Sequence, residues 1–129
     1  MFEVWKEFRF DAAHTLEASP TGDPRYRRMH GHSYQVEVWL CGNVSEKGWV
    51  VDMGEFETRI ASVAQRLDHY YLNDVEGLGI PTMENISAFV WRALEDVPGL
   101  NKIVVRRDSA REGCVYRGPL EDPGILRAG

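Results

Sequence analysis

Three histidines near the amino terminus have the residue type and spacing of a metal site. His30 and His32 are separated by Gly31, and residues two apart in a β-strand project from the same face. His14 ends an earlier strand-like stretch and can join them if the two strands are neighbours. Three protein ligands with an open fourth position are the usual arrangement of catalytic zinc. The spacing therefore predicts a Zn²⁺ site at His14, His30 and His32, with ordinary surface or core histidines as the alternative.

Such a site would catalyse proton transfer at a carbon or oxygen atom of a substrate. An ion held by neutral imidazoles keeps its positive charge and polarises a carbonyl or hydroxyl oxygen. The fourth histidine, His69, directly follows Asp68, and an aspartate can orient a histidine that carries protons near neutral pH. Adjacent residues of an extended segment face opposite ways, so this pair requires a bend. Otherwise Asp68 and His69 only cap the end of a helix.

The elements that must position these residues can be read from apolar periodicity. Alternation predicts strands, and apolar residues three and four apart predict two helices. Residues 113–117 are either a continuation of the last strand across a bulge or a separate short strand. Residues 15–28 have no periodicity and are expected to form a loop. The expected strands are 2–10, 30–41, 49–52 and 102–108, and the expected helices are 56–67 and 82–94.

The order β-β-β-α-α-β predicts an α+β domain, a four-stranded antiparallel sheet with both helices on one face. Residues 1–118 are expected to form this domain, and residues 119–129 a loose tail rich in proline and glycine. The two edges of the sheet invite pairing with further copies, so we expect a homo-oligomer.

Composition narrows the function classes. The net charge of −5 gives no overall attraction to nucleic acid or anionic lipid, and because no long apolar run or leader-like stretch opens the sequence we expect neither a membrane span nor a signal peptide. Cys41 and Cys114 are interpreted as thiols of a reducing, cytoplasmic protein, although one disulfide stays an alternative. Positive charge gathers around Arg28 and around Arg106 and Arg107. These arginines suit a small anionic substrate, with solvated surface arginines as the alternative.

Six short motifs in the same order resemble the 6-pyruvoyl-tetrahydropterin synthase family. The resemblance is strongest to its bacterial branch, the 6-carboxy-5,6,7,8-tetrahydropterin synthases of the queuosine pathway, and it covers nearly all of residues 3–118. Each motif alone is weak, and the ordered set is specific. The motifs are FDAAH at 10–14, HGHSY at 30–34, GWVVD at 48–52, LDHYYLN at 67–73, PTMEN at 81–85 and GCVYRG at 113–118.

The resemblance implies a fold, an assembly and a reaction. The fold is the tunnelling fold, in which sheets close into a β-barrel by trimerisation and two trimers stack into a hexamer, with active sites between subunits. The three histidines would hold zinc against the side-chain oxygens of 7,8-dihydroneopterin triphosphate or a related 6-substituted pterin. Asp68 and His69 match the proton-relay pair of the family. The reaction is elimination of the triphosphate or cleavage of the substrate side chain.

Two positions depart from the family pattern. Tyr26 stands where the bacterial enzymes have the catalytic cysteine, and a phenol of pKa ~10 is a weaker base near neutrality than a thiol of ~8.5. Asp108 stands where a glutamate anchors the pterin amidine edge, and Glu112 is a nearby substitute. Thr82 and Glu84 are further candidates for holding the pterin ring, although capping of the second helix explains both.

The sequence therefore predicts a zinc-dependent lyase on a pterin substrate. The alternatives are a diverged pterin-binding oligomer that has lost the base, a family member with altered substrate or reaction, and a structural zinc protein.

Overall fold

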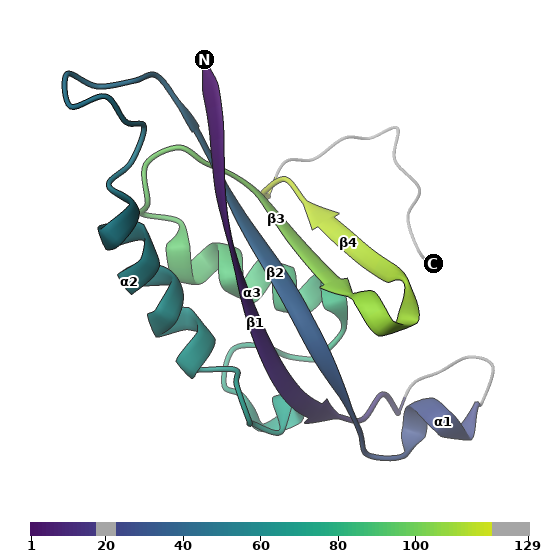
Figure 1. Cartoon of the computed structure of the whole chain (residues 1–129). Coiled ribbons are helices and arrows are strands. Elements are labelled where there is room, and N and C mark those ends of the chain that lie inside the picture. The colour runs from purple at the N-terminus through teal and green to yellow at the C-terminus, as the bar shows by residue number, and fades with distance from the viewer. Residues whose placement is uncertain (18–22, 120–129) are drawn as a thin grey trace.

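The computed structural model describes residues 1–17 and 23–119, which form an α+β unit. Figure 1 shows two long strands crossing in front of one helix, with a second helix to their left and a shorter pair of strands to their right. One-turn 3₁₀ segments, η1 (Leu72–Asp74) and η2 (Asp108–Ala110), join some of these elements. The main elements are β1 (Phe2–His14), α1 (Pro24–Arg27), β2 (His30–Gly42), α2 (Met53–Gln65), α3 (Met83–Leu94), β3 (Leu100–Arg107) and β4 (Glu112–Tyr116).

The sheet is antiparallel throughout, in the order β1-β2-β3-β4. The β1–β2 pair runs without interruption from Phe2 opposite Gly42 to His14 opposite His30. This pairing places His14 directly across from His30 and Ala12 across from His32. The predicted four-stranded antiparallel sheet is confirmed, and the expectation that the first two strands are neighbours is confirmed with it.

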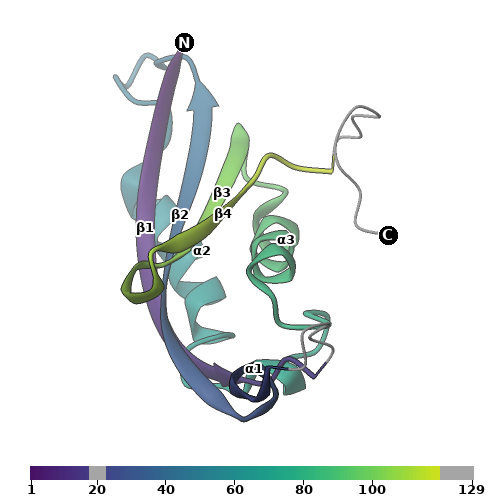
Figure 2. The ribbon, with the colours of Figure 1, turned by 90° about the vertical axis from the view of Figure 1, so that its right-hand side faces the viewer.

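Both long helices cover one face of the sheet, as predicted. The turned view places α2 and α3 on the same side of the strands, and the lower ends of β1 and β2 curve (Figure 2). Side chains of alternating residues of β1 and β2, including Phe10 and Tyr34, fill the core beneath the helices. Phe10 and Tyr34 stack with ring centroids 4.7 Å apart. Among the described residues, no helix is both long and apolar enough to span a membrane.

The predicted strand at residues 49–52 is wrong. These residues form a bend that leads into α2, and the side chain of Asp52 caps this helix by accepting the Gly54 N–H at 2.9 Å. The β-branched pair at 50–51 signals a strand, but a helix N-cap must take an extended conformation itself. The fourth strand is instead β4, which sequence analysis left open as a continuation of the preceding strand. Arg111, with φ of +58°, lies in the turn that reverses the chain into it.

Other boundaries differ by a few residues. Strand β1 continues beyond the predicted end at residue 10 as far as His14, because its pairing with β2 extends that far. The expected loop at residues 15–28 contains the short helix α1, capped by the side chain of Asp23. The predicted tail at residues 119–129 lies outside the described residues except for Pro119, so the domain boundary near residue 118 stays a prediction.

Gly99 provides a test of how β2 and β3 are held together. Its φ is +81°, and its carbonyl accepts the N–H of Cys41 at 2.8 Å. A Cβ at this position would overlap the Cys41 carbonyl oxygen, whereas one at Gly48 (φ +89°) meets no heavy atom within 4 Å. We predict that Gly99→Ala lowers the free energy of unfolding by roughly 2–4 kcal/mol, from the positive φ and the overlap together.

Gly48→Ala is the matched control, because it suffers the unfavourable φ alone, and we expect it to cost about 1–2 kcal/mol. Urea denaturation of the two variants and the unchanged protein measures both values. Equal losses in the two variants would contradict the proposed overlap with β2.

Candidate functional site

The three predicted metal ligands meet at one end of the sheet. The ligand nitrogens of His14, His30 and His32 all lie within 4.8 Å of one another. His30 and His32 continue the parity of buried Tyr34, so they face the helix side of the sheet. His14 reaches the same side from β1, and its side chain is 1% exposed. Strand register alone therefore brings together the three histidines that the spacing predicted.

Backbone carbonyls orient two of these imidazoles. The Nδ1–H of His14 donates to the Pro81 carbonyl at 2.9 Å, and the Nδ1–H of His30 donates to the Arg28 carbonyl at 2.7 Å. A neutral imidazole has a single N–H, so both Nε2 atoms are left with lone pairs. These two Nε2 atoms lie 3.0 Å apart and face each other. Two facing lone pairs at this distance repel unless a proton or a metal ion lies between them.

The spacing of the nitrogens fits a metal ion. Two ligands of a tetrahedral ion with bonds of ~2.0–2.1 Å are about 3.3 Å apart, close to the 3.0 Å between His14 Nε2 and His30 Nε2. A carbonyl acceptor behind a ligating histidine is the usual support of such a site. The cluster of three histidines can therefore hold a metal ion.

Burial keeps two of the ligands neutral, which is the form that binds metal. The pKa of His14 is lowered mainly by burial, and nearby His30 and Arg107 lower it further against the Pro81 hydrogen bond. Burial, followed by the charge of Arg107, lowers the pKa of His32 to about 4. Both rings are thus unprotonated at neutral pH even before any ion is bound.

Glu112, a predicted substrate contact, is paired with an arginine of the same chain. Its carboxylate pairs with Nη2 of Arg107 at 2.5 Å, and Nη1 of Arg107 donates to His32 Nε2 at 3.3 Å. Glu112 therefore reaches the histidines only through Arg107. Sequence analysis had noted Arg107 as part of a basic strand, and only the strand register shows that it faces the histidines.

The predicted Asp68–His69 pair is formed. Asp68 Oδ2 accepts from His69 Nδ1 at 3.0 Å, and Asp68 Oδ1 accepts the backbone N–H of Asp11 at 3.0 Å. Both interactions lower the pKa of Asp68, and the hydrogen bond from the Asp11 N–H has the larger effect. The required bend is present, since His69 has φ of +64°, and its own N–H donates to the Asp11 carbonyl. The pair is thus fixed against the edge of β1.

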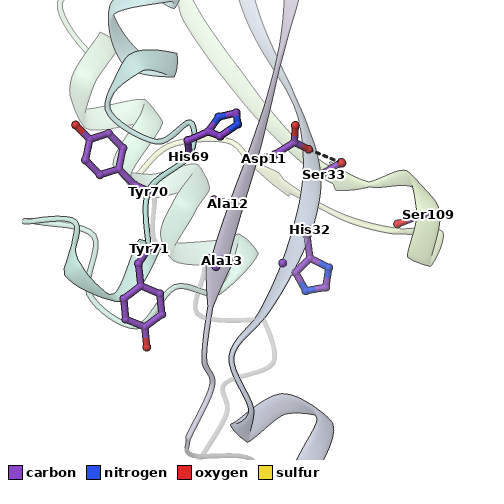
Figure 3. Close-up of a pocket in the computed structure, with 10 residues that line it drawn as sticks. Asp11, Ala12, Ala13, His32, Ser33, His69, Tyr70, Tyr71 and Ser109 are labelled. Carbon is purple, nitrogen blue, oxygen red and sulfur yellow. Dashed lines mark hydrogen bonds between the residues drawn. The ribbon is translucent and has the colours of Figure 1, made fainter.

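An open groove connects His69 with the sheet. A pocket of about 720 Å³ is lined by residues that include His32, His69, Asp11, Ser33 and Ser109. In the view of Figure 3, His69 lies on one side of β1, and the side chains of Asp11, Ser33 and His32 lie on the other. The hydroxyl of Ser33 donates to Asp11 Oδ1. The structure therefore brings His69 and one metal-ligand candidate to the same pocket.

A second pocket, of about 430 Å³, continues this groove past Ser33 and Ser109 to Asp108. The carboxylate of Asp108 accepts from Arg106 at 2.9 and 3.4 Å. The backbone N–H of Asp108 donates to Oε1 of Gln35. The Arg106 contact lowers the pKa of Asp108. The predicted pterin anchor is thus an ionised carboxylate that is already held in place.

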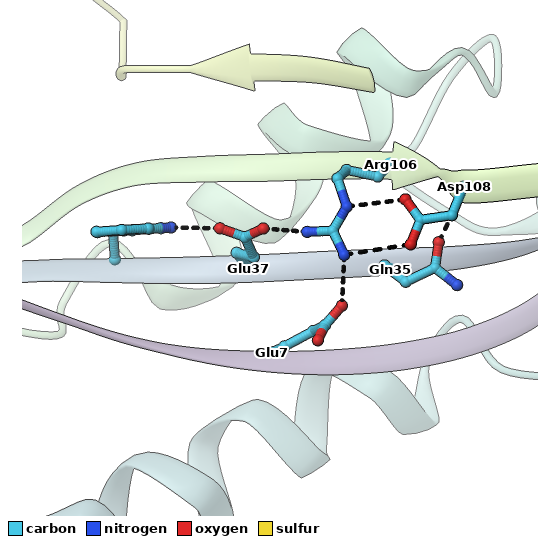
Figure 4. A network of polar contacts seen from close by, with 6 residues as sticks. Glu7, Gln35, Glu37, Arg106 and Asp108 are labelled. Atoms are coloured by element: carbon cyan, nitrogen blue, oxygen red, sulfur yellow. Dashed lines mark hydrogen bonds and ion pairs between the residues drawn. The ribbon is translucent and has the colours of Figure 1, made fainter. Parts of the chain in front are cut away.

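Arg106 is the centre of this network (Figure 4). Besides Asp108 it binds Glu7 of β1 at 2.8 Å and Glu37 of β2. Glu37 also accepts the indole N–H of Trp39 at 2.8 Å. One arginine thereby links β1, β2, β3 and η2 on the face of the sheet that the helices leave uncovered.

The remaining predicted residues lie around the site in different ways. Tyr26 lies in α1 with a side chain that is 43% exposed, its ring near the Arg25 guanidinium, and it is not among the described residues that line the groove. Arg28 contributes its carbonyl to His30. Thr82 caps α3 through Asn85, and Glu84 is exposed in the first turn.

Sequence reasoning missed the carbonyl of Pro81 as a partner of His14. The residue belongs to the motif at 81–85, but nothing in its side chain signals a backbone role. The cap at Thr82 fixes the chain immediately after this carbonyl. The helix cap and the orientation of His14 therefore depend on the same turn.

Comparison with known proteins decides the family. The sequence matches the model of the 6-pyruvoyl tetrahydropterin synthase family over residues 3–119. The chain belongs to this family. A Synechocystis protein named 6-carboxy-5,6,7,8-tetrahydropterin synthase is 40% identical over 113 residues, covering 81% of this chain and 85% of the relative. A putative enzyme of the same name from Archaeoglobus fulgidus is 36% identical over 97 residues, covering 75% and 78%.

Solved structures agree with this assignment. The 6-pyruvoyl tetrahydropterin synthase of Caenorhabditis elegans matches with a TM-score of 0.80 and 25% identity, covering 92% of this chain and 96% of that chain. The synthase of Plasmodium vivax matches with a TM-score of 0.70 at 19% identity, which shows the shared fold. The chain thus has the tunnelling fold of the 6-pyruvoyl tetrahydropterin synthases, a family of pterin-processing lyases.

The three-histidine centre can be tested by metal analysis. We predict that the purified protein, loaded with a divalent metal and dialysed, retains about one ion per chain. The double variant His30→Ala/His32→Ala removes two of three ligands and should lose it. His69→Ala is the matched control, because His69 binds Asp68 instead of the cluster. Full metal content in the double variant, measured by plasma mass spectrometry, would disprove the site.

Proposed function

We propose that the protein is a zinc-dependent lyase, similar to 6-carboxytetrahydropterin synthase, that acts on 7,8-dihydroneopterin triphosphate or a related 6-substituted pterin. The observation that carries this proposal is the pair of facing lone pairs on His14 Nε2 and His30 Nε2, 3.0 Å apart beside His32. Membership of the pterin synthase family supplies the substrate class.

Zinc fits the donor set, because imidazole nitrogens suit this ion and a three-histidine site leaves one position open. Bound there, the ion would supply Lewis acidity to a side-chain oxygen of the substrate. His14 and His30 are held for this role by the Pro81 and Arg28 carbonyls. The choice of zinc over other divalent metals rests on the chemistry of the donor atoms and on the family.

Asp68 and His69 are proposed as the proton carriers. The carboxylate of Asp68 accepts from His69 Nδ1, which leaves Nε2 of His69 free to take or give a proton. His69 is 79% exposed at the side chain, and it lines the larger pocket. An orienting carboxylate behind an accessible imidazole is the arrangement expected of a general acid–base group.

Asp108 is proposed to bind the pterin ring. A carboxylate can accept two parallel N–H bonds from an amidine edge, and Arg106 already fixes the orientation of this one. Thr82, Glu84 and Arg28 remain proposed contacts; Thr82 follows Pro81, whose carbonyl binds His14, and the carbonyl of Arg28 binds His30. Glu112 is likewise held by an arginine, Arg107, and remains the second candidate for this contact.

The complete site is proposed to form between subunits of a homohexamer, a dimer of trimers. The groove touches His32, whereas His14 and His30 are not among its described lining residues. One chain therefore does not enclose a substrate between the metal centre and Asp108. Within the described residues, β1 pairs along only one edge except for a single bridge from Ala13 to Tyr71, and β4 pairs only with β3. These edges are available for closing a barrel.

A second candidate function follows from Tyr26. The resemblance of the motifs places Tyr26 at the position of the family's catalytic cysteine, and its exposed side chain makes no contact with the histidines among the described interactions. The protein would then bind pterins without turnover, or act on a different pterin.

Both cysteines of the chain are unpaired, which agrees with the expected cytoplasmic location.

Turnover tests the proposal directly. We expect the zinc-loaded protein, incubated with 7,8-dihydroneopterin triphosphate and a panel of related pterins, to convert at least one of them, as detected by mass spectrometry. Asp68→Asn should lower kcat by roughly 10²–10⁴-fold, because His69 loses its orienting carboxylate, and it should leave zinc content unchanged. Asp74→Asn, in the nearby segment η1, is the matched control and should turn over normally. Binding of a pterin without any product would favour the second candidate function.

Tyr26 can be tested separately. If its hydroxyl carries a proton in place of the family cysteine, Tyr26→Phe should lower kcat at least tenfold with little change in KM. Tyr116→Phe is the control, since Tyr116 lies on β4 and lines neither pocket of the groove. Undiminished turnover in Tyr26→Phe would show that the phenol is not the proton carrier.

A further inference from the structure

Arg107 is a buried cation beside the metal centre that the proposed mechanism does not use. It lies at the end of β3, and its side chain is only 12% exposed. Its parity is that of buried Val105, so it faces the helix side of the sheet, whereas Arg106 faces the uncovered side. Nη1 of Arg107 is 3.3 Å from His32 Nε2, and Nη2 is 2.5 Å from Glu112.

The polar groups around Arg107 are incompletely satisfied. Its Nε is buried without a hydrogen-bond partner of ordinary geometry, and so is the hydroxyl of neighbouring Tyr34, whose residue is 0% exposed. Among the described residues, Glu112 is the only carboxylate paired with Arg107. Buried donors without acceptors are rare in proteins, and each one requires an explanation. A buried guanidinium N–H that lacks an acceptor is costly unless something else binds there.

A positively charged side chain next to a bound metal ion favours the binding of negatively charged ligands at that site. Arg107 loses the acceptor of its Nη1 N–H once the Nε2 lone pair of His32 is given to a metal ion. Nη1 would then be a cationic donor beside the centre without an acceptor. A neutral ligand such as imidazole in the open position leaves this donor unpaired, whereas an anionic oxygen accepts from it and also binds the metal.

We propose that Arg107, fixed from behind by Glu112, selects ligands with an anionic oxygen at the three-histidine centre. The ligand class is a carboxylate or a deprotonated hydroxyl, and neutral nitrogen or oxygen ligands are disfavoured. This inference rests on the metal site of the proposed function and adds the residue that determines which charge state of the substrate oxygen is bound. It does not depend on which pterin is the substrate.

A purely structural role makes a different prediction. If Arg107 only holds His32 in place, its removal would weaken metal binding by about 10–100-fold, as loss of a supporting contact does. Ligands of either charge would then be affected equally. If Arg107 selects anions, metal binding is retained or strengthened when the cation is removed, and only anionic ligands bind more weakly.

The test uses Co²⁺ as a spectroscopic probe in the intact protein, with acetate as the anionic ligand and imidazole as the neutral one. Both are titrated at one fixed pH into the Co²⁺-loaded protein, and changes in the visible spectrum give their affinities. In Arg107→Gln we expect acetate to bind about tenfold more weakly or worse, with imidazole affinity and Co²⁺ affinity not reduced. Arg59→Gln is the matched control, because Arg59 is also paired with a carboxylate, Asp96, but lies on α2.

Arg107→Lys keeps the positive charge but loses the fork of N–H donors. We expect it to weaken acetate binding without affecting imidazole. Equal acetate binding in Arg107→Lys and the unchanged protein would overturn the proposal, even if Arg107→Gln failed to fold. Parallel loss of acetate, imidazole and Co²⁺ binding in Arg107→Gln would also overturn it, in favour of a structural role.

The outcome for the proposed function is separate. Failure of the unchanged protein to bind Co²⁺ at the histidines would overturn the metal site and this inference together. If Arg107→Gln bound Co²⁺ normally and its ratio of acetate to imidazole affinity were unchanged, only the inference would be overturned. Absence of pterin turnover, by contrast, would leave the acetate and imidazole comparison fully informative.

Discussion

The uninterrupted pairing of β1 with β2 is the interaction on which the rest of the structure depends. Thirteen residues of β1 are matched one to one with β2, ending at His14 opposite His30. Because side chains alternate between faces, a slip of one residue would turn every buried side chain of β1 toward solvent. The core pair Phe10 and Tyr34, opposite each other in this register, opposes such a slip. The register that buries the core is thus the register that assembles the histidines.

The alternation of β3 gives two neighbouring arginines different tasks. Arg106 faces the uncovered side, where Glu7, Glu37 and Asp108 surround it. Arg107 faces the helix side, where one carboxylate and His32 contact it. Three carboxylates surround Arg106, whereas a single carboxylate pairs with Arg107 among the described residues. This contrast is why the network around Arg106 is complete in one chain and the surroundings of Arg107 point to a ligand.

Backbone groups contribute as much to the metal centre as side chains do. The carbonyls of Pro81 and Arg28 fix the tautomers of His14 and His30, and both lie just outside regular elements, Pro81 before α3 and Arg28 between α1 and β2. The N-cap of α3 and the C-cap of α1 hold these two carbonyls in place. A similar dependence holds for His69, whose left-handed backbone is fixed by its hydrogen bond to the Asp11 carbonyl. Helix ends and strand edges therefore set the geometry that the titratable side chains use.

The sequence alone determined the family, the sheet with its two helices, the three clustered histidines and the Asp68–His69 pair. These follow from local periodicity and from motifs whose residues are few and ordered. It did not determine the fourth strand, because residues 49–52 have strand propensity but serve as the entry to α2, while β4 becomes a strand only through pairing with β3. Nor did it determine that Glu112 is bound by Arg107, or that Pro81 orients His14. Those contacts join residues far apart in the chain or backbone atoms without a sequence signature, so only the tertiary structure decides them.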